Sequence, residues 1–373
     1  MTSQCETTYW IALAHLPRWG AEKINRLVVK IIHEKQMGLA DFFEAQEAWQ
    51  TDFELSEAQV QDLIQAKTEL PNTAFLAEDL LSQGFELVPI SSPEYSPTLK
   101  NNLKVKAPTV LYVKGNKQIM QENSIAIVGS RNADEVSLQF TDNIAKKASE
   151  QYQVVVSGFA RGVDKQALDS ALKYRGQSII VLPQGIMTFG SGIKKYYQAI
   201  TAGDALVLSI FPPKAVWATG LAMARNPIIY ALASEIYVAQ SADSGGTWTG
   251  ALDGLKKNRC VCVRQPQEGE QNANQLLIDK GAKAVDFEGY PIVSNPTDKQ
   301  APANNETAED IAQQIAILLQ NQALTPKQIR EKINTKLSEK ALIQHIKALP
   351  NVKKIKKSNK IHYFISAEIP GLF

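Results

Sequence analysis

From residue 125 to residue 287 the sequence alternates short apolar runs with amphipathic segments of ten to seventeen residues. Strands that are apolar on both faces and are separated by helices form a parallel sheet with helices on either side. We therefore predict an α/β fold, an extended Rossmann-like, doubly wound parallel sheet. Its expected strands are IAIVGS (125–130), VVVSGF (154–159), SIIVLP (178–183), ALVLSI (205–210), EIYVAQ (235–240), RCVCVR (259–264) and KAVDF (283–287).

The 373 residues exceed one ordinary domain, so flanking modules are expected around this core. Apolar spacing predicts a helical module over 1–70, of helix-hairpin-helix or SAM-like type. Its Pro17–Gly20 turn before a helix at Ala21 fits a phosphate-holding turn or a plain helical corner. The core then spans 71–288, with Pro71 breaking a helix and residues 85–113 extended. A Pro- and Asn-rich linker follows over 289–306, and a winged helix-turn-helix over 307–373.

The net charge of +2 hides a strong asymmetry along the chain. Residues 325–366 hold eleven Lys and Arg against two acids, a net of +9, whereas the remainder holds 29 bases against 36 acids, a net of −7. A basic module on an acidic chain predicts a polyanionic partner, although a winged helix also serves protein contacts. The lysines expected to contact nucleic acid are Lys336, Lys340, Lys347, Lys353, Lys354, Lys356, Lys357 and Lys360.

The sequence lacks the features that mark membrane proteins, secreted proteins and enzymes with a metal site or a catalytic triad. No apolar run approaches the length of a membrane span, and the first residues lack a secretion signal, so we expect a cytoplasmic protein with no membrane contact. The three cysteines suit a reducing compartment, and Cys260 and Cys262 should share one strand face. The four histidines are scattered over the flanking modules, so neither a metal site, a catalytic triad nor a cofactor is expected. Asp164 and Asp169 are expected to be helix caps or solvated positions.

Four short segments of the core, which we expect at the carboxyl edge of the sheet, are rich in small and cationic residues. Ligands of open parallel sheets bind at this edge, where glycine admits an anion to the backbone and arginine supplies a forked donor. A single glycine here could be an ordinary tight turn, but four such elements together favour a phosphate-binding site. The predicted site residues are Gly129, Ser130, Arg131, Ser157, Gly158, Arg161, Gly162, Arg225, Asn226, Gly245, Gly246 and Thr247.

The same segments resemble those of a known family. The series IAIVGSR, VVSGFARGVDKQALDSAL, SIIVLPQGI, LSIFPP, ARNPIIYALAS and SGGTWTGAL is similar to the DNA-processing protein A family, called DprA or Smf. The resemblance covers about residues 85–285. Departures at Val238–Gln240, at the SGGTW loop and at Arg264–Gln265 are typical of a divergent branch.

The resemblance implies a non-catalytic protein that binds single-stranded DNA and acts as a homodimer. Members of the family load a RecA-type recombinase onto that DNA during natural transformation. It also implies that Arg131, Ser157, Gly158 and Arg161 line the phosphate pocket, with Arg225 and Asn226 beside it. Gly245 and Gly246 would lie in a loop that opens a helix.

Other readings use the same residues. The GGTW loop resembles that of LOG-type phosphoribohydrolases, but no glutamate follows it, and Asp253 is the nearest acid downstream. Hydrolysis would then lack the carboxylate that supports an oxocarbenium-like transition state. A sensor of a nucleotide-derived ligand remains an alternative, as does a transcription regulator dominated by the winged helix, which would prefer duplex DNA.

Overall fold

The computed structural model describes residues 4–292, 315–316, 318–319, 324–333, 339–349, 352–357 and 360–365. The chain forms two compact units, Met1–Val293 and Ser294–Phe373. The first unit contains the nine-stranded sheet and the N-terminal helices, and the described residues of the second include helices and a two-stranded sheet.

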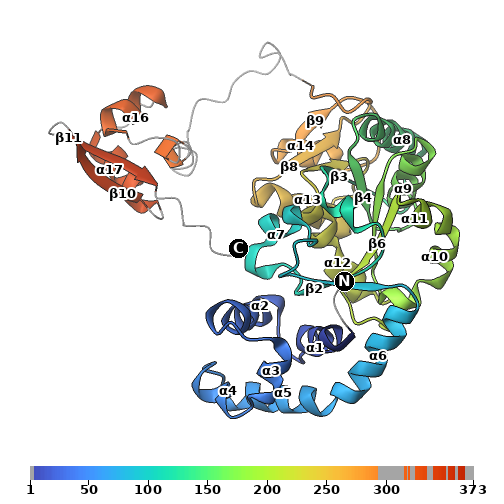
Figure 1. Ribbon diagram of the computed structural model, residues 1–373. Coiled ribbons are helices and arrows are strands. Elements are labelled where there is room, and N and C mark those ends of the chain that lie inside the picture. Colours follow the sequence, from blue (N-terminus) through green and yellow to red (C-terminus); the bar gives the residue numbers. More distant parts are fainter. Residues whose placement is uncertain are drawn as a thin grey trace. The chain divides into compact units, whose positions relative to one another are not determined.

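A nine-stranded sheet runs through the first unit in the order β1-β2-β6-β5-β4-β3-β7-β8-β9 (Figure 1). The predicted parallel arrangement is confirmed for β3 to β9, whereas β2 pairs antiparallel with β6 and β1 antiparallel with β2. The chain winds one way from β3 and the other way from β7, so the topological switch point lies between these two strands. The strands are β1 (Glu86–Pro89), β2 (Val110–Gly115), β3 (Ser124–Val128), β4 (Val154–Ser157), β5 (Ser178–Val181), β6 (Ala205–Ser209), β7 (Glu235–Val238), β8 (Cys260–Arg264) and β9 (Lys283–Val285).

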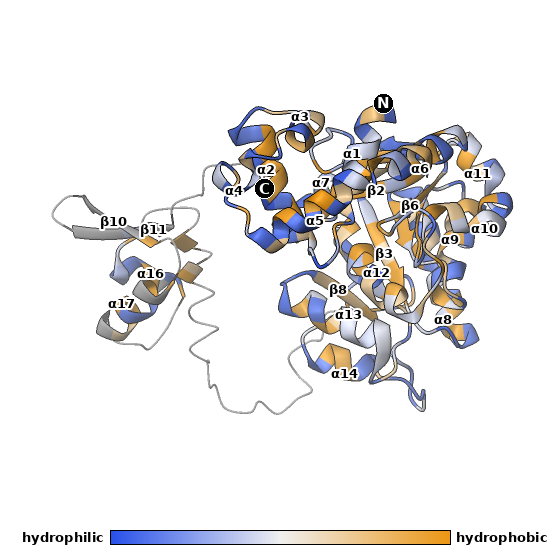
Figure 2. Cartoon of the chain, turned by 90° about the horizontal axis from the view of Figure 1, so that it is seen from below, coloured by the Kyte–Doolittle hydropathy of each residue, from blue (hydrophilic) through white to orange (hydrophobic). Residues whose placement is uncertain are grey.

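Helices cover both faces of the sheet because its strands are apolar on both faces. In β3, Ile125 and Ile127 pack in one cluster with α8 and α9, whereas Ala126 and Val128 pack in another with α12 and α13. Figure 2 shows this apolar interior against hydrophilic outer helix faces. The core helices are α7 (Pro97–Leu103), α8 (Glu135–Glu150), α9 (Val163–Lys173), α10 (Gly190–Lys195), α11 (Tyr197–Ala202), α12 (Thr219–Leu232), α13 (Gly245–Lys256) and α14 (Asn274–Asp279).

The prediction that residues 85–113 are extended is wrong in its middle, where α7 lies between β1 and β2. The Ser96 side chain accepts a hydrogen bond from the Leu99 amide, and Pro97 occupies the first turn of the helix. A capping serine followed by proline is a helix-start signal, and here it prevails over the extended pattern.

The N-terminal helices pack on the β1–β2 side of the core (Figure 1). Asn25 donates to the main-chain oxygens of Val105 and Ala107 at 2.8 and 2.7 Å, and Thr109 donates to the Asn25 amide oxygen at 2.8 Å. The expected helix start at Ala21 and the break near Pro71 are confirmed. The helices are α1 (Gln4–Ala14), α2 (Ala21–Val29), α3 (Leu39–Glu44), α4 (Ala48–Thr51), α5 (Glu57–Thr68) and α6 (Leu70–Ser82).

A partly buried histidine also connects these helices to the sheet. His15 Nε2 lies 2.7 Å from the hydroxyl of Tyr112 on β2. Burial lowers the pKa of His15 to about 4 and raises that of Tyr112. The imidazole is therefore neutral near pH 7, and it shares one hydrogen bond with the tyrosine hydroxyl.

Within the described residues of the second unit, helical residues at 315–316 and 318–319 are followed by α16 (Pro326–Lys332), α17 (Glu339–Ala348) and a hairpin of β10 (Val352–Lys357) and β11 (Lys360–Ile365). Thr325 is the N-cap of α16, and its side chain accepts a hydrogen bond from the Gln328 amide. Ile329, Leu342, Ile346 and Tyr363 form part of the small core of the unit. Residues 293–306 of the expected linker, Ser338 and Lys336 lie outside the described residues.

Candidate functional site

Two adjoining cavities lie at the carboxyl ends of the strands, beside the switch point. The first has a volume of about 410 Å³ and lies beyond β4 and β5; the second, of about 380 Å³, lies beyond β3 and β7. They share Arg131, Ala160, Ala222 and Arg225. The shared wall is therefore cationic, with α12 forming one side of both cavities.

Most of the predicted site residues meet at these cavities. The structure places nine of the twelve in their walls: Gly129, Ser130, Arg131, Gly158, Arg161, Arg225, Asn226, Gly246 and Thr247.

The other three lie close by without lining either cavity. Ser157 is fully buried and its hydroxyl donates to the Ile127 carbonyl oxygen at 2.7 Å, so it ties β4 to β3. Gly162 has a φ of +84°, and a Cβ there would lie 2.3 Å from the Ser130 carbonyl oxygen. This glycine lets α9 begin against the loop that follows β3. Gly245 opens α13 with a φ of +87°.

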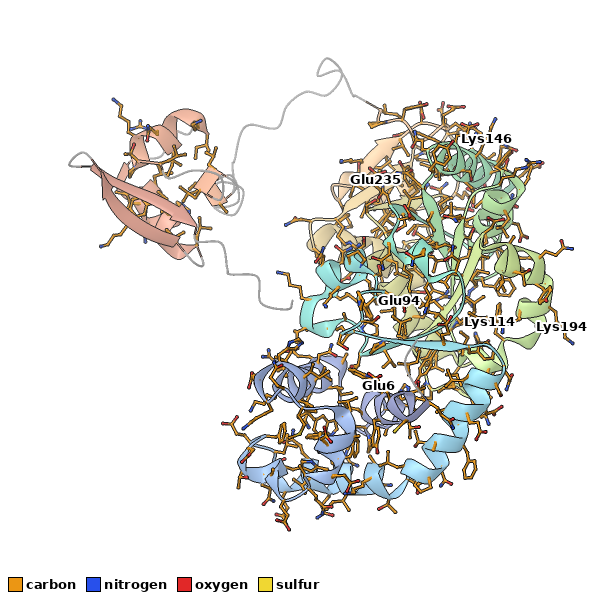
Figure 3. The ribbon with its side chains drawn as sticks, in the orientation of Figure 1. Glu6, Glu94, Lys114, Lys146, Lys194 and Glu235 are labelled. Carbon is orange, nitrogen blue, oxygen red and sulfur yellow. The ribbon has the colours of Figure 1, made fainter. Side chains whose placement is uncertain are left out.

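Two arginines are exposed and linked to each other. Arg161 donates from Nε to the main-chain oxygen of Arg131 at 3.3 Å and from Nη2 to Asn132 Oδ1. The loops after β3 and β4 therefore hold one another in place, and both guanidinium groups line the first cavity. Lys194, by contrast, points outward from α10 and lines neither cavity (Figure 3).

A third arginine is buried beneath them. Arg225 is only 3% exposed and donates from Nη1 to the Val181 carbonyl oxygen at 2.6 Å. Its Nε has no hydrogen-bond partner among the described residues. Burial lowers the pKa of this guanidinium. A buried donor without an acceptor costs free energy, and an anionic oxygen in the shared wall would satisfy it.

The expectation that Asp164 is solvated is wrong. It is 8% exposed and lines the second cavity, where its carboxylate accepts from the main-chain amides of Ala160 and Gly158. Burial raises its pKa, against the opposing effect of Arg225. Asp169 pairs instead with Lys195 at 3.0 Å. The acid considered for hydrolysis, Asp253, pairs with Lys257 at 2.7 Å on α13 and lines neither cavity.

Sequence reasoning missed the aromatic part of the first cavity. Phe159, Phe189 and Trp217 line it together with the arginines. Phe159 has a φ of +62° and packs edge-to-face on Phe189, with ring centroids 4.9 Å apart. These aromatics lie within SGFARG and in loops after β5 and β6, and only the phenylalanine in SGFARG stood inside a motif.

The remaining candidate features are simpler. The Sγ atoms of Cys260 and Cys262 lie 3.9 Å apart, which confirms their common strand face. Within the described ranges, no group of three or more His, Cys, Asp or Glu side chains is arranged to hold a metal ion. In the same ranges no helix has the length and hydropathy needed to cross a bilayer.

At the Pro17–Gly20 turn, Arg18 and Trp19 donate to the Asp62 carboxylate at 2.5 and 2.9 Å.

The fold and the cavities define a Rossmann-like protein whose two adjoining cavities share an arginine-bearing wall beside the switch point. The chain matches the family described as DNA recombination-mediator protein A over residues 86–294, more than half its length, and it belongs to that family.

Similar proteins agree with this assignment. DNA processing protein DprA of Bacillus subtilis is 28% identical over 206 residues, covering 54% of this chain and 69% of the relative. Protein Smf of Synechocystis is 26% identical over 304 residues, covering 78% of this chain and 72% of the relative. The crystal structure of DprA from Streptococcus pneumoniae superposes with a TM-score of 0.56 at 23% identity, covering 76% of this chain and 95% of that one. This last likeness shows a shared fold.

Proposed function

We propose that this protein binds the backbone of single-stranded DNA in the two strand-end cavities and does not cut it. The observation that carries the proposal is the convergence of Arg131, Arg161 and Arg225 on adjoining cavities, with the Nε of Arg225 unpaired. Glycine at 158 and 246 lets two of the predicted site residues pack directly against the backbone of the cavity walls, since a Cβ there would collide with Arg225 and Asn226 respectively. Membership of a DNA recombination-mediator family supports DNA as the anion.

A binding role also suits the state of the nearby acids. The Asp164 carboxylate is held by two main-chain amides, and Asp253 is paired with Lys257. Neither is arranged to activate water beside a bound nucleotide, as the runner-up phosphoribohydrolase reaction requires. The protein is proposed to act by holding the strand.

The finer role follows from family membership and from the charge map. We propose that the bound strand is handed to a RecA-type recombinase during natural transformation, and that the protein works as a homodimer. The second unit is proposed to be a winged helix that adds phosphate contacts through Lys336, Lys340, Lys347, Lys353, Lys354, Lys356, Lys357 and Lys360. Of these, the side chain of Lys354 is described and is exposed, and the other seven side chains lie outside what the structure describes.

The experiment is equilibrium binding of an oligothymidylate to single alanine variants of Arg131 and Arg161. Loss of a hydrogen bond to a charged group should cost about 1.5–3 kcal/mol of binding free energy. Arg26→Ala is the matched control, because Arg26 is 69% exposed on α2 and lines neither cavity. Folded Arg131→Ala and Arg161→Ala proteins that bind as tightly as the control would place the DNA site elsewhere.

A further inference from the structure

One exposed aromatic residue lies at the mouth of the first cavity. The Trp217 side chain lines that cavity and is 53% exposed, and its neighbour Val216 is 75% exposed. Trp10, Trp19 and Trp49 of the N-terminal module are by contrast buried. Exposed apolar surface beside a cavity marks a place that a ligand covers.

The loop that carries Trp217 is held firmly. The Gly185 amide donates to the Ala215 carbonyl oxygen at 2.8 Å, and the Met187 amide donates to that of Pro213 at 3.0 Å. Lys214 also pairs with Asp79 of α6 at 2.7 Å. A Cβ at Gly185 would lie 2.3 Å from the Pro213 carbonyl oxygen, so only glycine permits this contact. The loop is therefore anchored up to Ala215, two residues before Trp217, which limits the backbone entropy lost when a ligand binds.

The rest of the cavity suits a flat heterocycle. Phe159 and Phe189 supply apolar wall, and their edge-to-face packing keeps both rings in place. Gln184 also lines the cavity; its Nε2 donates to Thr188 Oγ1 at 2.8 Å, and its Oε1 has no partner among the described residues. An aromatic platform, an apolar wall and an open amide oxygen match the face and the edge of an unpaired nucleobase.

We propose that Trp217 is a stacking platform for one unpaired base of the DNA strand, whose adjoining phosphate is held at the wall shared by the two cavities. The inference rests on the proposed function and adds a contact that reads the base and not the backbone. A duplex hides the faces of its bases, so this contact also selects single-stranded DNA.

The experiment compares two ligands of equal length, an oligothymidylate and an abasic oligonucleotide with the same phosphates. Trp217→Ala should weaken binding of the oligothymidylate by roughly 5- to 150-fold, the range for one stacked base, and leave binding of the abasic strand unchanged. Trp217→Phe should restore most of the affinity. Tyr152→Ala is the control, because Tyr152 is 91% exposed and lies just before β4, at the opposite end of that strand from the cavities.

The outcomes separate the inference from the function on which it rests. If Trp217→Ala lost affinity equally for the oligothymidylate and the abasic strand, or for neither, the stacking role would be overturned. Binding of both strands by the wild-type protein would still support the DNA site. Failure of the wild-type protein to bind either strand would remove the proposed function itself. A second readout is tryptophan emission, which should be quenched by the oligothymidylate in wild-type protein, much less in Trp217→Phe, and little by the abasic strand.

Discussion

Gly158 and the Arg225 guanidinium are so close that a Cβ on Gly158 would lie 1.9 Å from Nη1. The same Cβ would lie 2.6 Å from Oδ2 of Asp164. The absence of a side chain at residue 158 is therefore what allows a buried arginine and a buried carboxylate both to pack against the loop after β4. These contacts connect the glycine of a motif to a residue 67 positions later in the chain.

Gly158→Ala is expected to displace Arg225 and to weaken binding of single-stranded DNA at least as much as loss of one arginine contact. Overpacking of this kind should also cost about 1–3 kcal/mol of stability, measured by urea denaturation. Gly220→Ala on α12 is the control, since a Cβ there meets nothing within 4 Å and the variant should bind normally. Normal DNA binding by Gly158→Ala would show that the position of Arg225 does not matter.

His15 should make stability depend on pH below neutrality. Its pKa is about 4 in the folded protein, against an ordinary value near 6.5, so between these values the unfolded chain binds more protons. The free energy of unfolding should therefore rise with pH across this window. At pH 5 it should be lower by up to about 2 kcal/mol than at pH values above the window. His15→Gln should flatten this part of the curve, whereas Tyr112→Phe should keep it. A slope that is unchanged in His15→Gln would assign the effect to other groups.

The basic C-terminal unit should add salt-dependent DNA affinity. Each lysine that neutralises a phosphate of a single strand contributes about 0.7 to the slope of log K against log salt. Replacing Lys353, Lys354, Lys356 and Lys357 by alanine should therefore lower that slope by up to roughly 3. A chain ending after Val293, the boundary between the two compact units, should show a similar decrease and bind more weakly at low salt. Identical slopes in all three proteins would make this unit a protein-docking surface.

The purified protein should release no free base from nucleoside monophosphates, because the Asp253 carboxylate is paired with Lys257 and the Asp164 carboxylate with main-chain amides. The measurement is chromatography of the nucleotide after prolonged incubation. Base release that is abolished by Asp253→Ala or Arg225→Ala would favour the phosphoribohydrolase alternative. Release that survives both substitutions would point to a contaminating enzyme, which repurification should remove.

The predictable parts of this protein are those encoded locally. Apolar runs between amphipathic segments identified β3 to β9, and small, polar and arginine residues near the strand ends identified nine of the residues that line the cavities. The signal for α7 is also local, because the Ser96 side chain caps the helix and Pro97 occupies its first turn.

The sequence by itself determined that the sheet is doubly wound, because residues apolar on both faces leave no alternative to helices on both sides. It also determined which strand ends are cationic. Only the tertiary structure decided that Arg225 is buried against Val181, that Asp164 is withdrawn from solvent and that Trp217 stands at the cavity mouth. The reason is that burial and orientation depend on residues brought together from distant parts of the chain, and no local pattern records those contacts.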